Sequence, residues 1–119
     1  MPVISFGAAG ERNTWLGAGW VYRGLLDHAR EAVAGDGALE FAIDKARALD
    51  GLHFHLTDER VARQLVAVLV GVADRVLAGD LLVSAEGRLL DDPSQAQFRD
   101  AVGDLRTMLR RYGRRWQAG

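Results

Sequence analysis

The strongest constraint on the fold is an apolar stretch near the middle of the chain, LVAVLVGVA at residues 65–73. Its β-branched residues would suit a strand, but nothing separates it from the flanking segments DERVARQL and ADRVLAGD, which have helical spacing. The combined length predicts one helix from Thr57 to about Ala78. Because this helix is apolar on nearly every side, we expect other helices to surround it at the centre of the core.

The residues before this stretch predict how its helix begins. Thr57 is placed to act as N-cap, and Asp58 and Glu59 then fall in the first turn, where the helix dipole favours negative charge. Leu56 and Val61 occupy the two positions of a hydrophobic staple. The apolar run of nine residues is less than half of the roughly 20 that a bilayer span requires, so no membrane contact is expected.

Two helices are predicted before this one. The first runs from Trp15 to about Val33, capped by Asn13 or Thr14, with apolar residues on one side at three- and four-residue steps. The second runs from Ala38 to Leu49 and ends at an Asp-Gly pair. The buried stripe of the second helix is expected to consist of Leu39, Ala42, Ile43, Ala46 and Leu49.

A last helix is predicted near the C-terminus. Asp92 is its expected N-cap, with Pro93 at the first helical position and Gln95 at the third, a capping box with Asp in place of Ser or Thr. The helix extends to about Tyr112 and stops at Gly113. Its apolar residues form an a/d seam of about two heptads, which is too short for a coiled coil.

The sequence therefore predicts a mainly α-helical, compact four-helix domain over residues 1–119. Residues 81–90 predict a small β-hairpin between the third and fourth helices, turning at Gly87. The N-terminal run PVISF is either a small edge strand or an extended arm. In this scheme residues 1–13 form an N-terminal arm and residues 114–119 a C-terminal tail.

The segment GLHFHLTDERV at residues 51–61 holds two of the three histidines. In an extended chain His53 and His55 point to the same side, and with Asp58 they would offer ligands for zinc or iron. Glu59 is the alternative carboxylate ligand, and His28 is a candidate for a further ligand. The competing interpretation is a plain connection between helices, with the apolar residues buried and the histidines facing water. This second interpretation is favoured, because His-x-His pairs are common by chance and the carboxylates already have a capping role.

Aromatic residues gather in two places. WLGAGWVYRG at residues 15–24 combines two tryptophans and a tyrosine with three glycines, and each glycine inside a helix costs about 1 kcal/mol relative to alanine. Another helix of the same chain, or else a partner chain or a flat apolar ligand, must approach this backbone closely. Because Trp and Tyr are enriched at interface hot spots, the residues predicted to contact a partner are Trp15, Trp20, Tyr22, Tyr112 and Trp116.

Charge and composition exclude several classes of function. The formal charge is −1, and the absence of cysteine removes disulfides, cysteine-ligated metals and thiol nucleophiles. The run RTMLRRYGRRWQ holds five arginines, but residues 80–104 hold six acids, which favours pairing within the molecule or across a dimer over nucleic-acid binding. No serine lies in a G-x-S-x-G or S-x-x-K motif. The N-terminus lacks the positive region and long apolar run of a signal peptide.

These observations predict a non-catalytic, cytoplasmic protein-interaction module of an accessory, regulatory or immunity/antitoxin type, with no cofactor. Its expected partner is another protein, a second copy of the chain, or both. Neither nucleic acid nor a membrane is expected to bind. The alternative function is that of a small metal- or ligand-binding protein, or an enzyme, that uses His53 and His55 with a nearby carboxylate.

Overall fold

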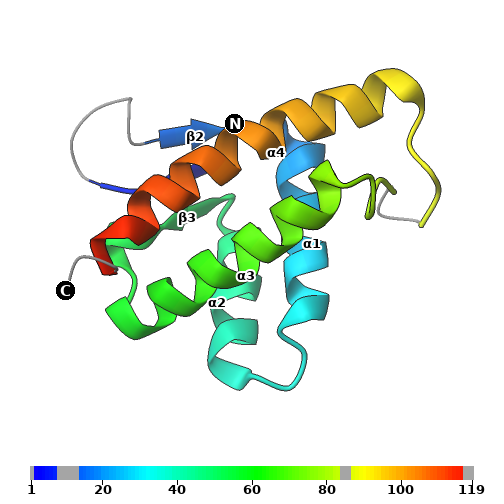
Figure 1. The fold of residues 1–119 in the computed structure, drawn as a ribbon. Coiled ribbons are helices and arrows are strands. Elements are labelled where there is room, and N and C mark those ends of the chain that lie inside the picture. The colour runs from blue at the N-terminus through cyan, green and yellow to red at the C-terminus, as the bar shows by residue number, and fades with distance from the viewer. Residues whose placement is uncertain (1, 8–13, 84–86, 117–119) are drawn as a thin grey trace.

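Four α-helices dominate the part of the chain that the computed structural model describes, residues 2–7, 14–83 and 87–116 (Figure 1). They are α1 (Gly19–Ala32), α2 (Gly37–Ala48), α3 (Glu59–Leu77) and α4 (Asp92–Gly113). The mainly α-helical class with four helices is confirmed. Within these ranges no helix combines the length and the apolar character that a membrane span requires.

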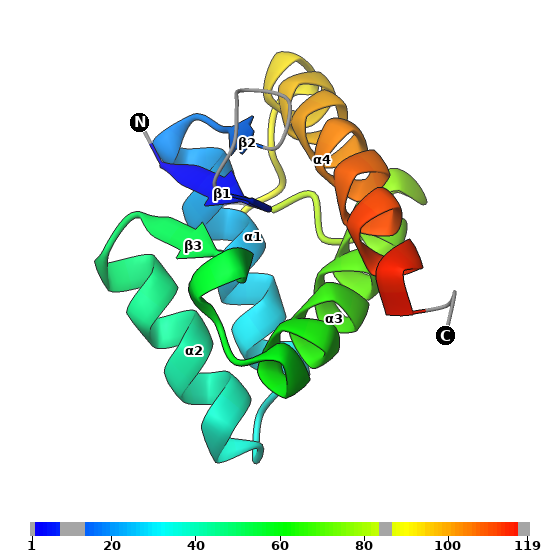
Figure 2. The same cartoon turned by 90° about the vertical axis from the view of Figure 1, so that its left-hand side faces the viewer.

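A small three-stranded sheet lies beside α4, as the view in Figure 2 shows. Strand β1 (Val3–Ser5) is in the middle, with β2 (Thr14–Leu16) antiparallel to it and β3 (Gly51–His53) parallel to it. The N-terminal strand predicted from PVISF is confirmed, but its predicted edge position is wrong, because it pairs with β2 on one side and β3 on the other.

The prediction of a first helix beginning at Trp15 is wrong. Trp15 lies in β2, and α1 begins only at Gly19. The reason is tertiary: pairing with β1 buries the indole, which is 4% exposed, and its Nε1–H donates to the carbonyl of Ala101 in α4 at 2.9 Å. Of the two expected caps, Thr14 is in β2 and Asn13 lies outside the described residues.

Residues 81–90, where the hairpin was predicted, contain one antiparallel bridge between Val83 and Leu89. A hydrogen bond from the Leu90 N–H to the Leu82 carbonyl, at 2.9 Å, supports it. The position of the β element agrees with the prediction, although residues 84–86 of its turn lie outside the described ranges. The larger β element is the sheet in the N-terminal half of the chain.

Helix α3 begins one residue later than predicted. Asp58, not Thr57, is its N-cap: the Asp58 Oδ2 accepts from the N–H of Arg60 at 3.1 Å and of Val61 at 3.3 Å. The Thr57 hydroxyl is committed elsewhere, because it donates to the His53 carbonyl at 2.8 Å. The shifted cap also contradicts the predicted staple, because with Asp58 as N-cap the N′ and N4 positions fall on Thr57 and Ala62 instead of Leu56 and Val61.

Helix α4 shows the opposite shift, by one residue toward the N-terminus. Asp91, not Asp92, is the N-cap, and its Oδ1 accepts from the Ser94 N–H at 2.8 Å. Hydrogen bonding by Ser94, first through its side chain and then through its backbone, holds the pKa of the Asp91 carboxyl below its usual value. The Gln95 side chain donates to the Leu90 carbonyl at 2.7 Å, which fixes the chain as it enters the helix.

Helix α3 contacts all three other helices but is not surrounded by them, so that prediction is wrong. One side is open to solvent along its first three turns, where Arg63, Ala67 and Gly71 are exposed at four-residue steps. A Cβ added to Gly71 would meet no atom within 4 Å. The reason is that α4 runs along one side of α3 while α1 and α2 share another, which leaves no helix for the third (Figure 2).

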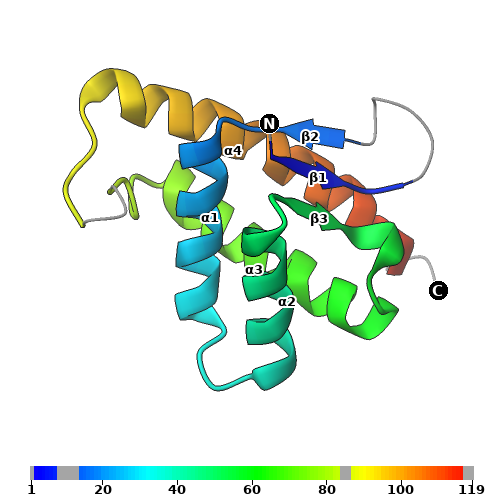
Figure 3. The ribbon, with the colours of Figure 1, turned by 180° about the vertical axis from the view of Figure 1, so that it is seen from behind.

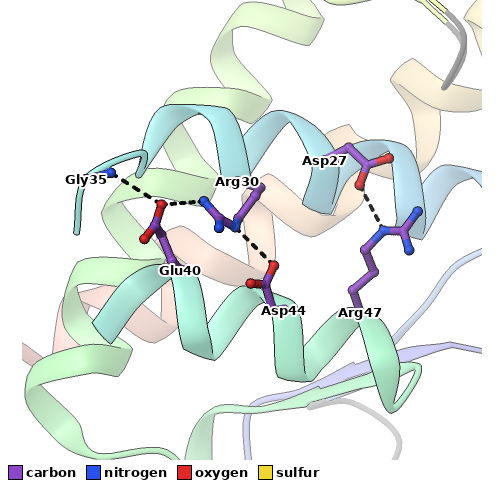
Figure 4. Close-up of polar contacts among 6 residues, drawn as sticks. All are labelled: Asp27, Arg30, Gly35, Glu40, Asp44 and Arg47. Atoms are coloured by element: carbon purple, nitrogen blue, oxygen red, sulfur yellow. Dashed lines mark hydrogen bonds and ion pairs between the residues drawn. The ribbon is translucent and has the colours of Figure 1, made fainter. Parts of the chain in front are cut away.

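Helices α1 and α2 form an antiparallel hairpin, seen best from behind (Figure 3). Ion pairs line its outer surface (Figure 4): Arg30 contacts Glu40 at 2.6 Å and Asp44 at 3.0 Å, and Arg47 contacts Asp27 at 2.8 Å. These pairs are solvent-exposed and contribute little individually to stability. They nevertheless occupy one side of α2, so that side is directed toward α1 and is not free to contact another molecule.

The buried connection in this hairpin is the hydroxyl of Tyr22, a fully buried residue that donates to the Ala46 carbonyl at 2.6 Å. Burial, aided by the negative charge of Asp50, raises the pKa of Tyr22 well above its ordinary value.

We expect Tyr22→Phe to lower the free energy of unfolding by about 1–2 kcal/mol, because the ring still packs but a buried carbonyl loses its partner. Urea denaturation measures this. Tyr112→Phe is the matched control, since the described residues give the Tyr112 hydroxyl no hydrogen bond, and a loss as large in that variant would contradict the assignment.

Candidate functional site

A groove of about 480 Å³ runs between α2 and the segment that leads into α3. Its first wall is α2, and its second wall consists of β3, the short 3₁₀ helix η2 (Phe54–Leu56) and the first turn of α3. We call this surface the α2 groove. Its lining is mainly apolar, and it includes Phe41, Ala42, Leu49, Leu52, Leu56 and Val61.

Helix α2 forms the first wall because one of its three sides is free of contacts with the core and with α1. Leu39, Ile43 and Ala46 are buried in the core, and the ion-paired residues face α1 (Figure 4). The remaining side carries Phe41, Lys45 and Leu49 at four-residue steps. Phe41 is 70% exposed and Leu49 is 67% exposed.

The prediction that Leu49 is buried with the inner stripe is therefore wrong. The helix ends at Ala48, and Leu49 is the C-cap residue, so its side chain leaves the inner side. The chain then reverses through Asp50, which has a φ of 52°. The rest of the expected stripe is placed correctly at Leu39, Ile43 and Ala46, while Ala42 is half-buried.

The second wall presents Leu56, whose side chain is 77% exposed. It was expected to be buried, but the helical turn η2 directs it outward while Phe54, two residues earlier, is 1% exposed. Single exposed leucines are ordinary on protein surfaces. Three large apolar side chains bordering one groove form a contiguous patch, which is the kind of surface that marks an interaction site.

Two imidazoles meet a serine hydroxyl at the edge of the sheet, next to this groove. The Ser5 Oγ lies 2.7 Å from the Nδ1 of His53 and 3.5 Å from the Nδ1 of His55. The register of β1 and β3 places Ser5 directly opposite His53, and η2 then brings His55 back toward the same hydroxyl. The two rings are 5.9 Å apart between centroids. The hydroxyl is largely buried, whereas both histidines are exposed.

The structure does not bring the third predicted ligand, Asp58, to this pair. The Asp58 carboxylate caps α3 instead, as described above. His28, the remaining histidine, is on α1, and its buried Nε2 has no hydrogen-bond partner among the described residues. Across residues 2–7, 14–83 and 87–116, no three His, Asp or Glu residues gather in a metal-binding arrangement.

The aromatic residues predicted to contact a partner pack mainly against their own chain. Trp15 and Tyr22 are buried and hydrogen-bonded within the fold. Trp20 stacks on Phe98 of α4 with ring centroids 5.9 Å apart. Tyr112 and Trp116 are half-buried.

The glycines between these aromatic residues admit parts of the same chain. A Cβ at Gly17 would lie 2.2 Å from the Trp15 ring, and one at Gly24 would lie 3.5 Å from the Phe98 ring. The sequence left open whether the same chain, or a partner chain or flat ligand, approaches these glycines. At Gly17 and Gly24 the close neighbours belong to the same chain.

Comparison of the chain with protein-family models, with curated proteins and with solved structures finds no match. The function must therefore be argued from the two surface features above, the α2 groove and the serine–histidine cluster.

The serine–histidine cluster yields a quantitative prediction. We expect a double-mutant cycle of Ser5→Ala and His53→Ala to give a coupling free energy of about 1 kcal/mol, because the 2.7 Å hydrogen bond joins β1 to β3. The cycle of Ser5→Ala with His55→Ala should give a smaller value, since those atoms are 3.5 Å apart. Urea denaturation at one fixed pH measures both cycles. Equal couplings would show that the hydroxyl does not prefer His53.

Proposed function

We propose that the protein is a non-catalytic interaction module that pairs with a second copy of itself through the α2 groove. The observation that carries the proposal is the exposure of Phe41, Leu49 and Leu56 around one apolar groove. Burial of such side chains stabilises by roughly 1.5–3 kcal/mol each, which supplies the main free energy of association. An accessory, regulatory or antitoxin role in the cytoplasm is consistent with this kind of module, and the lack of cysteine suits a reducing compartment.

A second copy is favoured over an unrelated partner because the surface is complementary to itself. The groove has both a projecting ring, Phe41, and a cavity able to receive one. It also has opposite charges on opposite walls, Lys45 on α2 and Asp58 at the start of α3. A twofold axis through the groove would place Phe41 of each copy in the other groove and Lys45 of each copy near the other Asp58.

The non-catalytic part of the proposal is supported by the surroundings of Ser5. Ser5 as a residue is only 8% exposed, and its hydroxyl lies within hydrogen-bond distance of two imidazoles. The ring atom that faces it is Nδ1, and no carboxylate among the described residues is hydrogen-bonded to either imidazole. A nucleophilic serine needs an accessible hydroxyl and a base that a third group orients.

Substitution of Phe41 tests the dimer directly. We expect Phe41→Asp to raise the dissociation constant of the homodimer at least about 30-fold, because a charge replaces the ring at the centre of the interface. Sedimentation equilibrium measures this. Leu89→Asp is the matched control, since Leu89 is 75% exposed but lies outside the groove, and it should leave the constant unchanged. Self-association would be refuted if the wild-type protein remained monomeric in sedimentation equilibrium even at 100-fold the concentration used to compare the variants.

The charge arrangement gives an independent check of the geometry. Lys45→Glu should weaken the dimer several-fold, because it sets two negative charges against each other across the twofold axis. Adding Asp58→Asn should restore part of the loss, since asparagine keeps the N-cap of α3 and removes the charge. Failure of the double variant to recover any affinity would exclude this orientation of the two copies.

A second candidate function is metal binding, favoured by the convergence of two imidazole Nδ1 atoms on the Ser5 Oγ. Imidazole nitrogens suit zinc and iron, the metals considered from the sequence. On this hypothesis purified protein contains zinc or iron by elemental analysis, and calorimetry shows Zn²⁺ affinity reduced at least tenfold by His53→Ala and by His55→Ala. His28→Ala should leave the affinity intact. Metal-free protein that fails to bind added Zn²⁺ would eliminate this candidate.

A further inference from the structure

A second groove, of about 680 Å³, lies along the open side of α3. It runs between α3 and the last turns of α4 with η3 (Arg114–Trp116), the short 3₁₀ helix that follows. We call it the arginine groove. It shares no lining residue with the α2 groove, so a ligand there would be bound independently of the proposed dimer.

The floor of the arginine groove is apolar. It consists of Val66, Ala67 and Val70 from α3 and Leu109 from α4. Ala67 and Val70 are thus part of the apolar pattern that predicted a fully surrounded helix, although no other helix covers them completely. Val66 and Leu109 are buried, whereas Ala67 is exposed and Val70 is half-buried, so Ala67 and Val70 supply the apolar surface that a ligand could cover.

The walls of the arginine groove carry positive charge only. Arg63 stands on the α3 wall, and Arg110 and Arg114, one helical turn apart, stand on the opposite wall. No acid lines the groove. Among the described residues, no ion pair involves Arg63, Arg110 or Arg114, in contrast to Arg30, Arg47 and Arg106, which are paired with carboxylates.

The aromatic residues near the groove are already engaged. The Trp116 Nε1–H donates to the Glu59 carboxylate at 3.0 Å, which fixes η3 against the start of α3. The Tyr112 ring packs against Phe54, and the Arg115 guanidinium covers it at 4.5 Å from the centroid. A single-stranded nucleic acid needs free aromatic faces on which its bases can stack. This arrangement disfavours nucleic acid as the ligand.

We propose that the arginine groove binds an acidic amphipathic helix of a partner protein. The α3 wall from Arg63 to Val70 is about 10 Å long, or two turns of helix, at about 1.5 Å per residue. A docked helix would place apolar side chains at i, i+3 or i+4 and i+7 on the floor. Its carboxylates on either flank would pair with Arg63 on one wall and with Arg110 and Arg114 on the other.

Fluorescence anisotropy with designed peptides tests this proposal. The probe is a labelled 14-residue helical peptide with leucines on one face and glutamates beside them. We expect it to bind at least tenfold more tightly than a scrambled peptide of the same composition, and than the same peptide with lysine in place of glutamate. A 20-nucleotide oligothymidylate is the competitor. Displacement of the peptide by equimolar oligothymidylate, or equal binding of all peptides, would overturn the proposal.

Variants locate the binding surface. Arg63→Glu, Arg110→Glu and Ala67→Glu should each weaken peptide binding at least tenfold, and all three positions are exposed, so the fold should tolerate them. Arg75→Glu is the matched control, because Arg75 is an exposed arginine of α3 outside the groove. The Phe41→Asp variant should bind the peptide as tightly as the wild type, so loss of the dimer and loss of peptide binding are distinguishable. Unchanged affinity in all three groove variants would refute the assignment.

Discussion

The fold depends on how α3 is covered by the rest of the chain. An isolated apolar helix must bury its whole circumference, and three further helices are available to cover it. Helix α4 packs antiparallel along one side, with Asp74 and Arg106 paired across the contact, and α1 with α2 packs on another. The solvent-exposed side of α3 that results does not arise from the packing of individual side chains. It follows from the number of helices and from the short connection between α1 and α2, residues 33–36, which keeps both helices on the same side of α3.

The sheet joins segments that are far apart in the sequence, because β1 near the N-terminus pairs with β3 at residues 51–53. Three strands of three residues each are too short to be stable alone. They persist because Ile4 and Leu52 are buried beneath the helices and because Trp15 is hydrogen-bonded to α4. The same pairing places Ser5 opposite His53. The serine–histidine cluster is therefore a consequence of sheet register.

Helical periodicity was sufficient to predict the existence of all four helices, because an apolar stripe is a local property. The caps of α3 and α4 were predicted within one residue but not at the right residue, and at α3 competing hydrogen bonds decided between Thr57 and Asp58. The caps predicted for α1 were at least four residues too early, because its N-cap is Ala18. Strands β2 and β3 were not predicted, because three residues paired with a distant strand leave no local pattern. Ser5 was missed for the same reason. The exposure of Leu49 and Leu56 depends on where a helix ends, which is the least predictable feature of a sequence.

The distribution of charge along α4 has a consequence of its own. The helix is about 33 Å long at about 1.5 Å per residue, with Asp91 and Asp92 at its start and Arg110 and Arg111 in its last turn. The side-chain charges at the two ends of α4 therefore oppose the backbone macrodipole of the same helix and stabilise both of its ends. Because these charges are exposed, their stabilising effect on α4 is largest at ionic strengths well below about 0.1 M, where the Debye length exceeds about 10 Å.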